Sequence, residues 1–422
     1  MEAEWMAIRE KVMNRLDLTR TVTDEELEEL IDEEILRWSK SHWLSLEQRI
    51  QYAKEIFNSM RKLDVLQELL EDEAVTEIMV NGSRNIFYEK AGALHKWNRQ
   101  FASEDKLEDV IQQIVGQNNR RVNTSTPIAD TRLADGSRVN IVLQPIAVDG
   151  SCLSIRKFPK EALTMKHLLE LQALSQGVAD YLGMLVRSGY NIFVSGGTGS
   201  GKTTFLNALS AYIPSYERLI TIEDSAELQI KGIPNLVRLE TRNKGSEGTA
   251  EISIRDLIRT ALRMRPDRII VGECRGAETL DMLQAMNTGH DGSLSTGHAN
   301  SGRDMLSRLE TMVLMGMELP VQAIRGQIAS GIDILVHLGR LRDRSRKVLE
   351  VMELDGICQG ELRLRTLFRF EETEESGGRL YGKWKLEHGI RHREKLRAAG
   401  NEQALMQLEQ QEGAEDDRSK AV

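Results

Sequence analysis

The chain has 422 residues, which is enough for two or three domains that each bury their own core. Its 65 acidic and 56 basic residues give a formal net charge of −9, which argues against a protein whose whole surface follows nucleic acid. Three separated cysteines form no C-x-x-C pair, and no stretch approaches the roughly 18 continuous apolar residues of a membrane-spanning helix, so neither a cysteine metal site nor an integral membrane protein is indicated.

The first part of the chain is expected to hold a helical extension and then a small α/β domain. Residues 1–55 are charge-rich, with apolar residues such as Leu27, Leu30 and Ile31 at helical spacing, and we interpret them as an amphipathic helical cap. Residues 56–158 change to short strand-like runs, together with one helix that Ser103 would cap. The expected strands cover residues 77–80, 85–88, 137–147 and 151–158.

The second half alternates strand and helix signals. A linker at 159–166 is expected to lead into a nucleotide-binding domain of residues 167–345, with a largely parallel sheet flanked by helices. Its expected strands cover 190–195, 219–223, 236–242, 268–272 and 293–296, and its expected helices cover 203–211, 254–262 and 277–288. Residues 346–410 form a C-terminal extension with hairpin-like runs, and the polar, acidic segment 411–422 is expected to be disordered.

A complete G-x-x-x-x-G-K-[S/T] motif lies between the strand 190–195 and the helix 203–211. It comprises Gly196, Gly197, Thr198, Gly199, Ser200, Gly201, Lys202, Thr203 and Thr204. The glycines let successive backbone N–H groups turn toward phosphate oxygens at the positive end of the helix. Lys202 would reach the β- and γ-phosphates, and the Thr203 hydroxyl would ligate Mg²⁺. A flexible glycine-rich linker would not end in Gly-Lys-Thr at a strand-to-helix junction. The chain is therefore predicted to bind a nucleoside triphosphate.

Acidic residues follow two of the expected strands. Glu223 and Asp224 close the strand 219–223, where carboxylates face the ligand crevice of a parallel sheet and could orient water or hold Mg²⁺ through its water shell. Acids at such a place often only cap the following helix. Glu273 follows the apolar strand 268–272 and is the leading candidate for general base or for Mg²⁺ support. An apolar strand followed by one acidic residue is a common chance match in α/β proteins, but the position of Glu273 downstream of the phosphate loop favours a functional role.

Two histidines lie among glycines near the expected strand 293–296. His290 precedes this strand and His298 follows it. One of them could hydrogen bond to the γ-phosphate and convert its loss into a domain movement. Either could instead be a structural histidine with satisfied hydrogen bonds.

Taken together, these segments resemble the type II/type IV secretion ATPases, and within them the CpaF-like branch that powers Tad/Flp pilus assembly. The matching segments are residues 196–204, 221–224, 264–273 and 295–300, joined by 74–82, 128–140, 155–158 and 394–400. The resemblance covers nearly all of the chain from about residue 60 to 400. The sequence departs from the branch at Cys274, where valine is usual, and before Leu66, where a Gly-Pro turn is often seen.

The resemblance implies a RecA-like ATPase domain after a smaller N-terminal domain, a homohexameric ring, and ATP with Mg²⁺ as the bound groups. It implies that Glu273 activates water with help from Glu223, and that His298 reports loss of the γ-phosphate. It also implies that arginines of the N-terminal domain reach the phosphates, and the matching candidates are Arg132, Arg138 and Arg156. A guanidinium suits the spread charge of phosphoryl transfer, and an arginine finger is worth about 10³ to 10⁵ in rate.

The resemblance further implies an integral inner-membrane platform protein as partner, with this chain in the cytoplasm and only peripherally associated with the membrane. The first residues lack the basic and apolar regions of a secretion signal, as this expectation requires. A nucleic-acid motor is a second hypothesis, but it would need a basic pore with stacking aromatics, and aromatic residues make up only 5% of the chain, so no stable nucleic-acid partner is expected. A third hypothesis is a non-catalytic scaffold that binds nucleotide without hydrolysing it. The presence of all the candidate acidic residues and of both histidines argues against this hypothesis.

Overall fold

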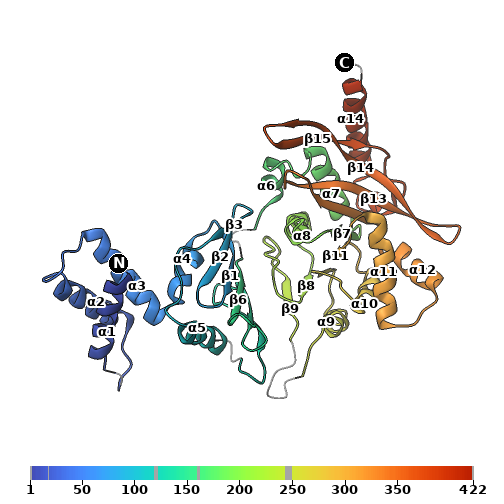
Figure 1. Cartoon of the computed structure of the whole chain (residues 1–422). Helices are drawn as coiled ribbons and strands as arrows, with labels where there is room; N and C mark the ends of the chain where they lie inside the picture. The colour runs from blue at the N-terminus through green and yellow to red at the C-terminus, as the bar shows by residue number, and fades with distance from the viewer. Residues whose placement is uncertain (1, 18, 118–121, 159–161, 243–249, 421–422) are drawn as a thin grey trace. The chain divides into compact units, whose positions relative to one another are not determined.

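The computed structural model describes residues 2–17, 19–117, 122–158, 162–242 and 250–420. The chain forms two compact units, Met1–Lys160 and Glu161–Val422 (Figure 1). Their boundary falls in the predicted linker at 159–166, of which residues 159–161 lie outside the described part and residues 165–166 already belong to a helix. None of the helices in the described ranges combines the length and apolar character needed to cross a bilayer.

Three helices at the start of the first unit pack around a core of their own. They are α1 (Glu2–Arg15), α2 (Asp24–Trp38) and α3 (Leu46–Arg61). Thr23 and Ser45 begin α2 and α3 with reciprocal caps, in which the side chain of each residue accepts from the third helical N–H and that third side chain accepts in return. The shared core contains Ile8, Val12, Leu27, Ile31, Ile35, Leu44, Tyr52 and Ile56. The helical extension therefore runs to Arg61, a few residues past the predicted end at 55.

The rest of the first unit is an antiparallel sheet with one buried face. Its strands, in the spatial order β3-β2-β1-β6-β5-β4, are β1 (Val75–Asn81), β2 (Asn85–Lys90), β3 (Ala93–Lys96), β4 (Ile128–Arg132), β5 (Arg138–Val142) and β6 (Cys152–Arg156). The helix α5 (Glu104–Gly116), capped by Ser103 as predicted, packs in the same core, as do a 3-10 turn at Asp64–Leu66 and α4 (Gln67–Glu71). Burial alternates along β4, β5 and β6, so every second side chain lies on the other, exposed face.

The second unit is built on a nine-stranded sheet in the order β15-β14-β13-β12-β7-β11-β10-β8-β9. The strands are β7 (Ile192–Gly196), β8 (Leu219–Glu223), β9 (Leu236–Glu240), β10 (Arg268–Val271), β11 (Leu294–His298), β12 (Ile334–Arg340), β13 (Arg346–Cys358), β14 (Glu361–Ser376) and β15 (Arg379–Leu386). From β12 to β9 all neighbours are parallel, which confirms the predicted sheet. The predicted C-terminal extension joins the same sheet, because β13, β14 and β15 add to β12 as antiparallel strands.

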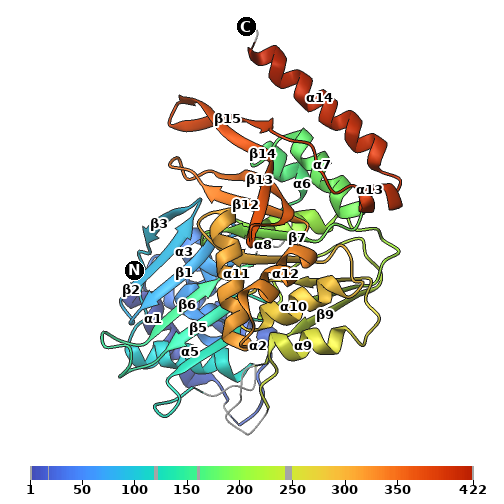
Figure 2. The ribbon, with the colours of Figure 1, turned by 90° about the vertical axis from the view of Figure 1, so that its right-hand side faces the viewer.

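Helices cover both faces of this sheet. One face carries α6 (Met165–Glu170), α7 (Gln176–Arg187) and α8 (Lys202–Ser210), and the other carries α9 (Ile254–Ala261), α10 (Glu278–Asn287), α11 (Gly302–Gly316) and α12 (Val321–Gly331). Figure 2 shows α10, α11 and α12 gathered on one side of the sheet. The central strand β7 alternates between the two cores, since Ile192 and Val194 pack with the first group and Phe193 packs with the second.

The end of the chain differs from the prediction. After α13 (Glu394–Ala398), the helix α14 (Glu402–Lys420) runs through most of the segment that we predicted to be disordered, and residues 421–422 lie outside the described part. Two physical reasons account for the difference. Leu405 is buried in the core of the second unit and anchors the start of the helix. Of the fifteen residues that follow, up to Lys420, seven are glutamate, glutamine or alanine, which are good helix formers.

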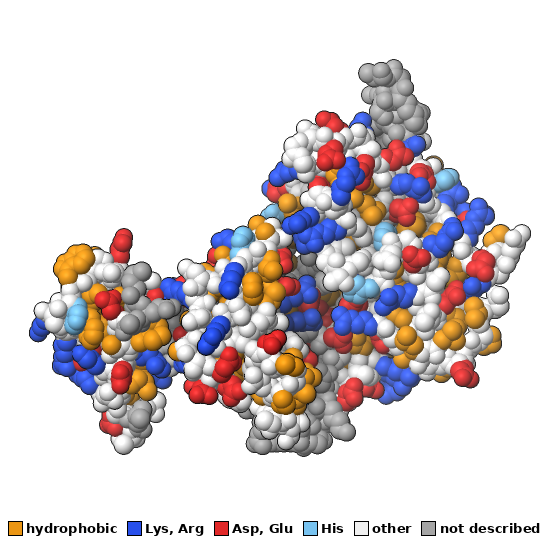
Figure 3. Space-filling model, in the orientation of Figure 1, with side chains coloured by type: hydrophobic (Ala, Val, Ile, Leu, Met, Phe, Trp, Pro, Cys, Tyr) orange, Lys and Arg blue, Asp and Glu red, His pale blue; other side chains and the backbone are white. Residues whose placement is uncertain are grey.

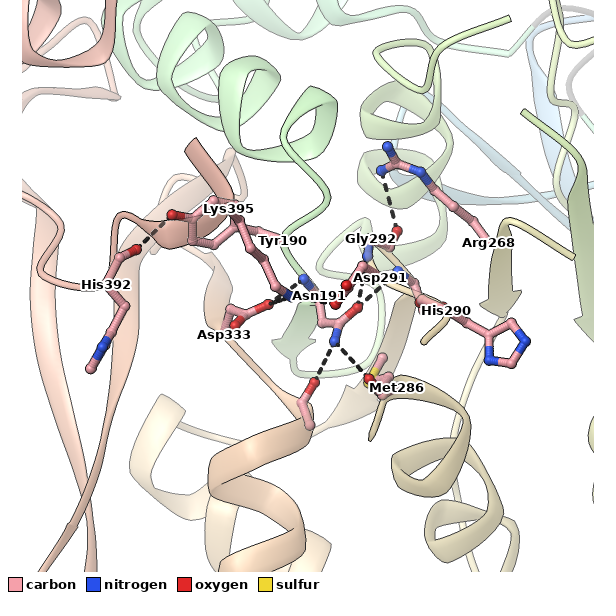
Figure 4. A network of polar contacts seen from close by, with 12 residues as sticks. Tyr190, Asn191, Arg268, Met286, His290, Asp291, Gly292, Asp333, His392 and Lys395 are labelled. Carbon is pink, nitrogen blue, oxygen red and sulfur yellow. Dashed lines mark hydrogen bonds and ion pairs between the residues drawn. The ribbon is translucent and has the colours of Figure 1, made fainter. Parts of the chain in front are cut away.

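A polar network holds the amino ends of the strands together (Figure 4). Asn191, directly before β7, is 1% exposed. Its Oδ1 accepts from the N–H groups of Gly292 at 2.9 Å and Ser293 at 3.0 Å, and its Nδ2 donates to the carbonyls of Gly331 at 2.8 Å and Met286 at 3.3 Å. One side chain thus ties the chain before β11 to the ends of α10 and α12.

The same edge holds the C-terminal segment. Lys395 of α13 lies 2.7 Å from Asp333 and 2.8 Å from Asp291, and the Tyr190 hydroxyl donates to the carbonyl of His392 at 2.6 Å (Figure 4). Because these contacts are all at the amino edge, they leave the carboxyl ends of the parallel strands to form a site.

Candidate functional site

The predicted phosphate loop joins the carboxyl end of β7 to the start of α8. A side chain at Gly196 would have to lie 2.5 Å from the carbonyl oxygen of Leu338, so β12 passes too close for any residue but glycine. Gly199 and Gly201 have φ values of 70° and 93°, in the left-handed region that favours glycine. The loop conformation therefore depends on the glycines that define the motif.

The start of α8 offers backbone N–H groups that no side chain caps. No side chain caps the helix, so the N–H groups of its first turn, which contains Thr203 and Thr204, stay available for an anion. The Ser200 hydroxyl is buried and has no hydrogen-bond partner within the described residues. Lys202 is buried, and its Nζ donates to the carbonyl of Gly197 at 3.1 Å. This set of donors fits a chain of phosphates.

Glu223 lies at the carboxyl end of β8, which is separated by β11 and β10 from β7, the strand that leads into the phosphate loop. Its Oε2 accepts from the N–H groups of Glu227 at 2.7 Å and Leu228 at 3.0 Å, while Oε1 is buried without a hydrogen-bond partner in the described part of the chain. Burial raises the pKa of Glu223, although these two hydrogen bonds act in the opposite direction. Glu223 therefore fixes the segment that follows β8 and keeps one oxygen for a water or a metal-bound water.

Glu273, His298 and Lys202 lie in a row at the same edge. His298 Nε2 is 2.7 Å from Glu273 Oε1, although that oxygen accepts no hydrogen bond of regular geometry from any described residue. The other ring nitrogen, Nδ1, is 3.2 Å from Lys202 Nζ. Burial lowers the pKa of His298, and the charges of Lys202, Arg275 and Arg308 lower it further against the opposing effect of Glu273. The imidazole is therefore neutral near neutral pH.

Arg275 contacts two of the predicted carboxylates, those of Glu273 and Asp224. Its Nε and Nη2 donate to Glu273 Oε2 at 2.9 and 2.7 Å, and its Nη1 lies 3.8 Å from Asp224 Oδ2. No group of three His, Cys, Asp or Glu side chains among the described residues could hold a metal ion. Mg²⁺ needs no such group, because it is usually held by one or two carboxylates together with waters and substrate phosphates. Thr203 and Asp224 fit that role, whereas Glu273 would first have to release Arg275.

Cys274 belongs to the core rather than to the chemistry. Its sulfur is buried and packs 3.2 Å from the sulfur of Met282. Burial raises the pKa of Cys274 to about 12, so the thiol stays protonated. This supports the view that the replacement of valine by cysteine is a small apolar change.

His290 is a correction to the prediction. Since β11 is parallel to β7 with His298 paired to Gly196, the chain before Leu294 lies at the amino edge of the sheet, opposite the phosphate loop. There the His290 ring contacts the carbonyl of Ala285 at 3.2 Å, at the end of α10, and Figure 4 shows it beside the amino-edge network. His290 is therefore separated by the length of a strand from the nucleotide site of its own chain, and only His298 reaches that site.

The three predicted arginines lie in one row across the first unit. Arg132 pairs with Arg138 across β4 and β5, and Arg138 pairs with Arg156 across β5 and β6. Directly opposed residues of antiparallel strands point to the same face, which here is the exposed one. Like charges in such positions are unfavourable, so the row is suited to an anion.

Two residues of the loop region were missed from the sequence. Arg275 stands two positions after Glu273, and an arginine this close to the candidate catalytic carboxylate could have been noticed. Arg346, at the start of β13, donates from Nε to the carbonyl of Gly199 at 2.8 Å. Nothing in the sequence signals this second contact, because the two residues are 147 positions apart.

A groove of about 770 Å³ opens beside the loop. It is lined by Gly197 and Thr198, by Arg275 and His298, and by residues of α11 that include Asp304, Ser307 and Arg308. The groove places exposed loop backbone, two arginines and the neutral histidine around one space, as a polyphosphate site requires.

Known proteins match this chain over most of its length. Residues 60–421 match the family model described as type II/IV secretion system protein. The chain belongs to this family. A putative conjugal transfer protein of Mycobacterium tuberculosis is 34% identical over 69% of this chain and 84% of its own length. The type IV secretion system protein PtlH of Bordetella pertussis is 34% identical over 70% of this chain and 95% of its own length.

A solved structure agrees with the fold. The X-ray structure of the ATPase DotB from Yersinia pseudotuberculosis covers 69% of this chain and 78% of DotB, at 19% identity and a TM-score of 0.51. This likeness concerns the fold alone. This likeness and the phosphate loop at the carboxyl edge of a parallel sheet together identify the second unit as a RecA-like P-loop core. In the chain it follows a separate N-terminal domain.

Proposed function

We propose that this secretion-family protein is an ATP hydrolase that powers assembly of a Tad/Flp-type pilus or type II/IV secretion across the cell envelope. The observation that carries the proposal is the row Lys202, His298 and Glu273, in which successive side chains lie 3.2 and 2.7 Å apart beside the phosphate loop. A lysine for phosphates, a neutral histidine and a carboxylate for water are the groups that phosphoryl transfer to water requires.

Each side chain has a separate task. The α8 N–H groups and Lys202 bind the β- and γ-phosphates, and Glu273 orients and deprotonates the attacking water. Glu223 supports this water through its unpaired oxygen. Mg²⁺, held with the nucleotide by Thr203 and Asp224, would neutralise phosphate charge. His298 contacts both the loop lysine and Glu273, so departure of the γ-phosphate would change its hydrogen bonds first.

Membership of the family supports a proposal for the wider setting of this activity. We propose a homohexamer in the cytoplasm that acts on an integral inner-membrane platform protein and is only peripherally associated with the membrane. The arginine row of Arg132, Arg138 and Arg156 would supply the positive charge that completes the nucleotide site. Its like charges on one exposed face support this assignment.

The experiment uses the full-length protein with Mg²⁺ and ATP. Lys202→Ala is expected to abolish nucleotide binding, whereas Glu273→Gln is expected to retain ATP and to stop phosphate release. Glu374→Gln, at an exposed glutamate of β14, is the matched control and should behave as the unaltered protein. Rapid hydrolysis by Glu273→Gln would refute its role as the base. Nucleotide binding without any phosphate release, even with the platform protein present, would favour the scaffold hypothesis.

The face that Figure 3 shows gives no support to a nucleic-acid motor. On the visible face in Figure 3, Lys and Arg side chains are interspersed with Asp and Glu. A backbone-tracking groove would instead gather positive charge. Stimulation of phosphate release by single-stranded DNA would overturn this conclusion.

A further inference from the structure

The module formed by α1, α2 and α3 carries an exposed apolar patch where α2 connects to α3. The patch consists of Trp43, Leu46 and Ile50, which are 85%, 73% and 63% exposed, and we call it the Trp43 patch. Leu46 and Ile50 are one turn apart on α3 and Trp43 precedes Leu46 by three residues, so the three lie near one another. Single exposed apolar residues are ordinary, but such a group marks a surface that another molecule covers.

The outward position of Trp43 is built into the fold. The ring of His42 stacks on Trp38 with 4.3 Å between the ring centres, and the backbone N–H of His42 donates to the Trp38 carbonyl at 3.0 Å. On the other side, Leu44 is buried in the core of the module, and Ser45 begins α3 with its reciprocal cap. Trp43 is therefore held between anchored residues, and Leu44 takes the place in the core.

Charge is unevenly distributed over the same module. Residues 24–34 contain eight acidic and no basic residues, whereas residues 37–50 contain three basic residues and one acidic residue, Glu47. Arg37 is paired with glutamates of α2. Lys40 and Arg49 form no ion pair with any described residue. In a chain with a formal net charge of −9, uncompensated positive charge thus borders the Trp43 patch.

We propose that the Trp43 patch docks this module onto an anionic lipid surface. Trp43, Leu46 and Ile50 enter the boundary between headgroups and acyl chains, where tryptophan is favoured. Lys40 and Arg49 then face the headgroups, whose negative charge attracts them. The acidic residues of α2 oppose any other orientation of the module on such a surface.

The shape of the patch favours lipid over a protein partner. Peptides and helices dock into grooves or along sheet edges, whereas side chains that are 63–85% exposed stand out from the surface. The inference goes beyond the proposed ATPase function and does not rest on it. The patch lies before residue 60, where the match to the family begins.

The experiment measures flotation of the full-length protein with lipid vesicles. Vesicles of phosphatidylcholine alone are compared with vesicles of equal parts phosphatidylcholine and phosphatidylglycerol. The unaltered protein is expected to float only with the anionic vesicles, and more weakly as salt is raised. Trp43→Ala is expected to weaken this binding about tenfold or more. Tyr216→Ala, at a tyrosine of the second unit that is also 85% exposed, is the matched control and should bind as the unaltered protein.

A charge reversal tests the basic border of the patch. Lys40→Glu is expected to weaken binding to the anionic vesicles about tenfold at low salt and much less at high salt. Lys166→Glu changes the net charge equally at an exposed lysine of α6 and should have little effect. Circular dichroism of each variant checks that it has folded.

Lipids with brominated acyl chains locate the indole of Trp43. They are expected to quench a fluorescence component of the unaltered protein that Trp43→Phe lacks. Trp43→Phe should still bind the vesicles, because it retains an aromatic side chain at this position. This readout requires the side chain to enter the bilayer, so contact with another protein would not produce it.

The alternatives give different results. Equal binding to both kinds of vesicle, unchanged binding by Trp43→Ala, or absence of the quenched component overturns the proposal. If Trp43→Ala instead changes the oligomeric state without lipid, a second copy of the chain covers the patch, and the lipid proposal is wrong. Phosphate release without vesicles should be the same in every variant, so a failure of the proposed ATPase function is seen separately.

Discussion

Glu273 Oε1 and His298 Nε2 lie 2.7 Å apart, while the other nitrogen of the same ring lies 3.2 Å from Lys202 Nζ. Because the pKa of His298 is lowered, the ring is neutral and carries a single N–H. Lys202 can only donate, so Nδ1 accepts and the proton belongs on Nε2, toward Glu273. The lysine of the phosphate loop and the candidate base thus lie on the two sides of one neutral imidazole.

This arrangement predicts a kinetic effect rather than a binding effect for His298. His298→Ala is expected to lower kcat by about 10² or more, because Glu273 loses the imidazole that lies 2.7 Å from its Oε1, with little change in KM for ATP. Steady-state phosphate release against ATP concentration measures both constants. His388→Ala, at an exposed histidine of the second unit, should match the unaltered protein. A raised KM with unchanged kcat would instead assign His298 to ground-state binding.

Glu223 should matter for stability as well as turnover. Glu223→Ala leaves the N–H groups of Glu227 and Leu228 without their acceptor, at a cost of about 1–3 kcal/mol in the free energy of unfolding. Glu223→Gln keeps an acceptor oxygen and should lose less stability, while both variants lose turnover. Urea denaturation followed by circular dichroism gives the two free energies. Equal stabilities for the two variants would contradict the anchoring role of this carboxylate.

The sequence predicted those elements whose signal is local. The strand at β8 was expected at 219–223 and is observed at those residues, because an apolar run closed by acids can only be a buried strand here. The phosphate loop was equally clear, since its glycines, lysine and helix are contiguous. Ser103 was recognised as a cap because its evidence lies within one helical turn.

Features that depend on strand pairing could not be predicted in this way. The alignment of Arg132, Arg138 and Arg156 in one row is a property of register, which one residue of slippage would destroy. His290 is a candidate in the sequence because it lies among glycines at one end of an expected strand, as His298 does at the other end, but that strand carries the two histidines to opposite edges of the sheet. The contact of Arg346 with Gly199 exists only after β12 and β13 have joined the sheet.

The arginine row predicts a variant that loses activity without losing stability. Arg156 is exposed, so Arg156→Ala should change the free energy of unfolding by no more than about 0.5 kcal/mol, and relief of like-charge repulsion favours the variant. Turnover should fall by about 10-fold or more if the guanidinium contacts phosphate. Thermal melting and phosphate release on the same sample give both values. Unaltered turnover in Arg156→Ala and Arg138→Ala alike would remove the row from the site.

Asn191 is expected to be among the most sensitive positions for folding. Asn191→Ala removes a buried side chain with four hydrogen bonds and leaves two N–H groups and two carbonyls at the amino edge without partners. We expect a loss of about 2–4 kcal/mol in the free energy of unfolding of the second unit. Asn401→Ala, which removes a single side-chain bond to Ser188 at 2.9 Å, is the comparison and should cost about 1 kcal/mol. Similar losses for the two variants would show that ordered water replaces the Asn191 contacts.

His337 should make the second unit sensitive to mild acid. It is buried on β12, with its Nδ1 2.9 Å from the Ser195 hydroxyl, and burial lowers its pKa below the ordinary 6.5. The unfolded chain therefore binds a proton at this histidine at a higher pH than the folded chain does. As a result, the contribution of the neutral His337 ring to the free energy of unfolding is fully present above pH 6.5 and is lost as the pH falls toward the folded pKa. One such group changes the free energy of unfolding by at most about 1.4 kcal/mol per pH unit.

The measurement compares thermal melting of the unaltered protein and His337→Gln between pH 7.5 and about 5, a range that brackets the ordinary histidine pKa. The variant is expected to be less stable at the higher pH, because it disturbs a packed position, but to lose less on acidification. His298 also has a lowered pKa and contributes a loss of the same sign, but it is present in both proteins and cancels in the difference. His388→Gln, at an exposed site, should follow the unaltered protein at every pH. Parallel melting curves for the unaltered protein and His337→Gln would mean that the buried ring at β12 takes up its proton as readily as it does in the unfolded chain.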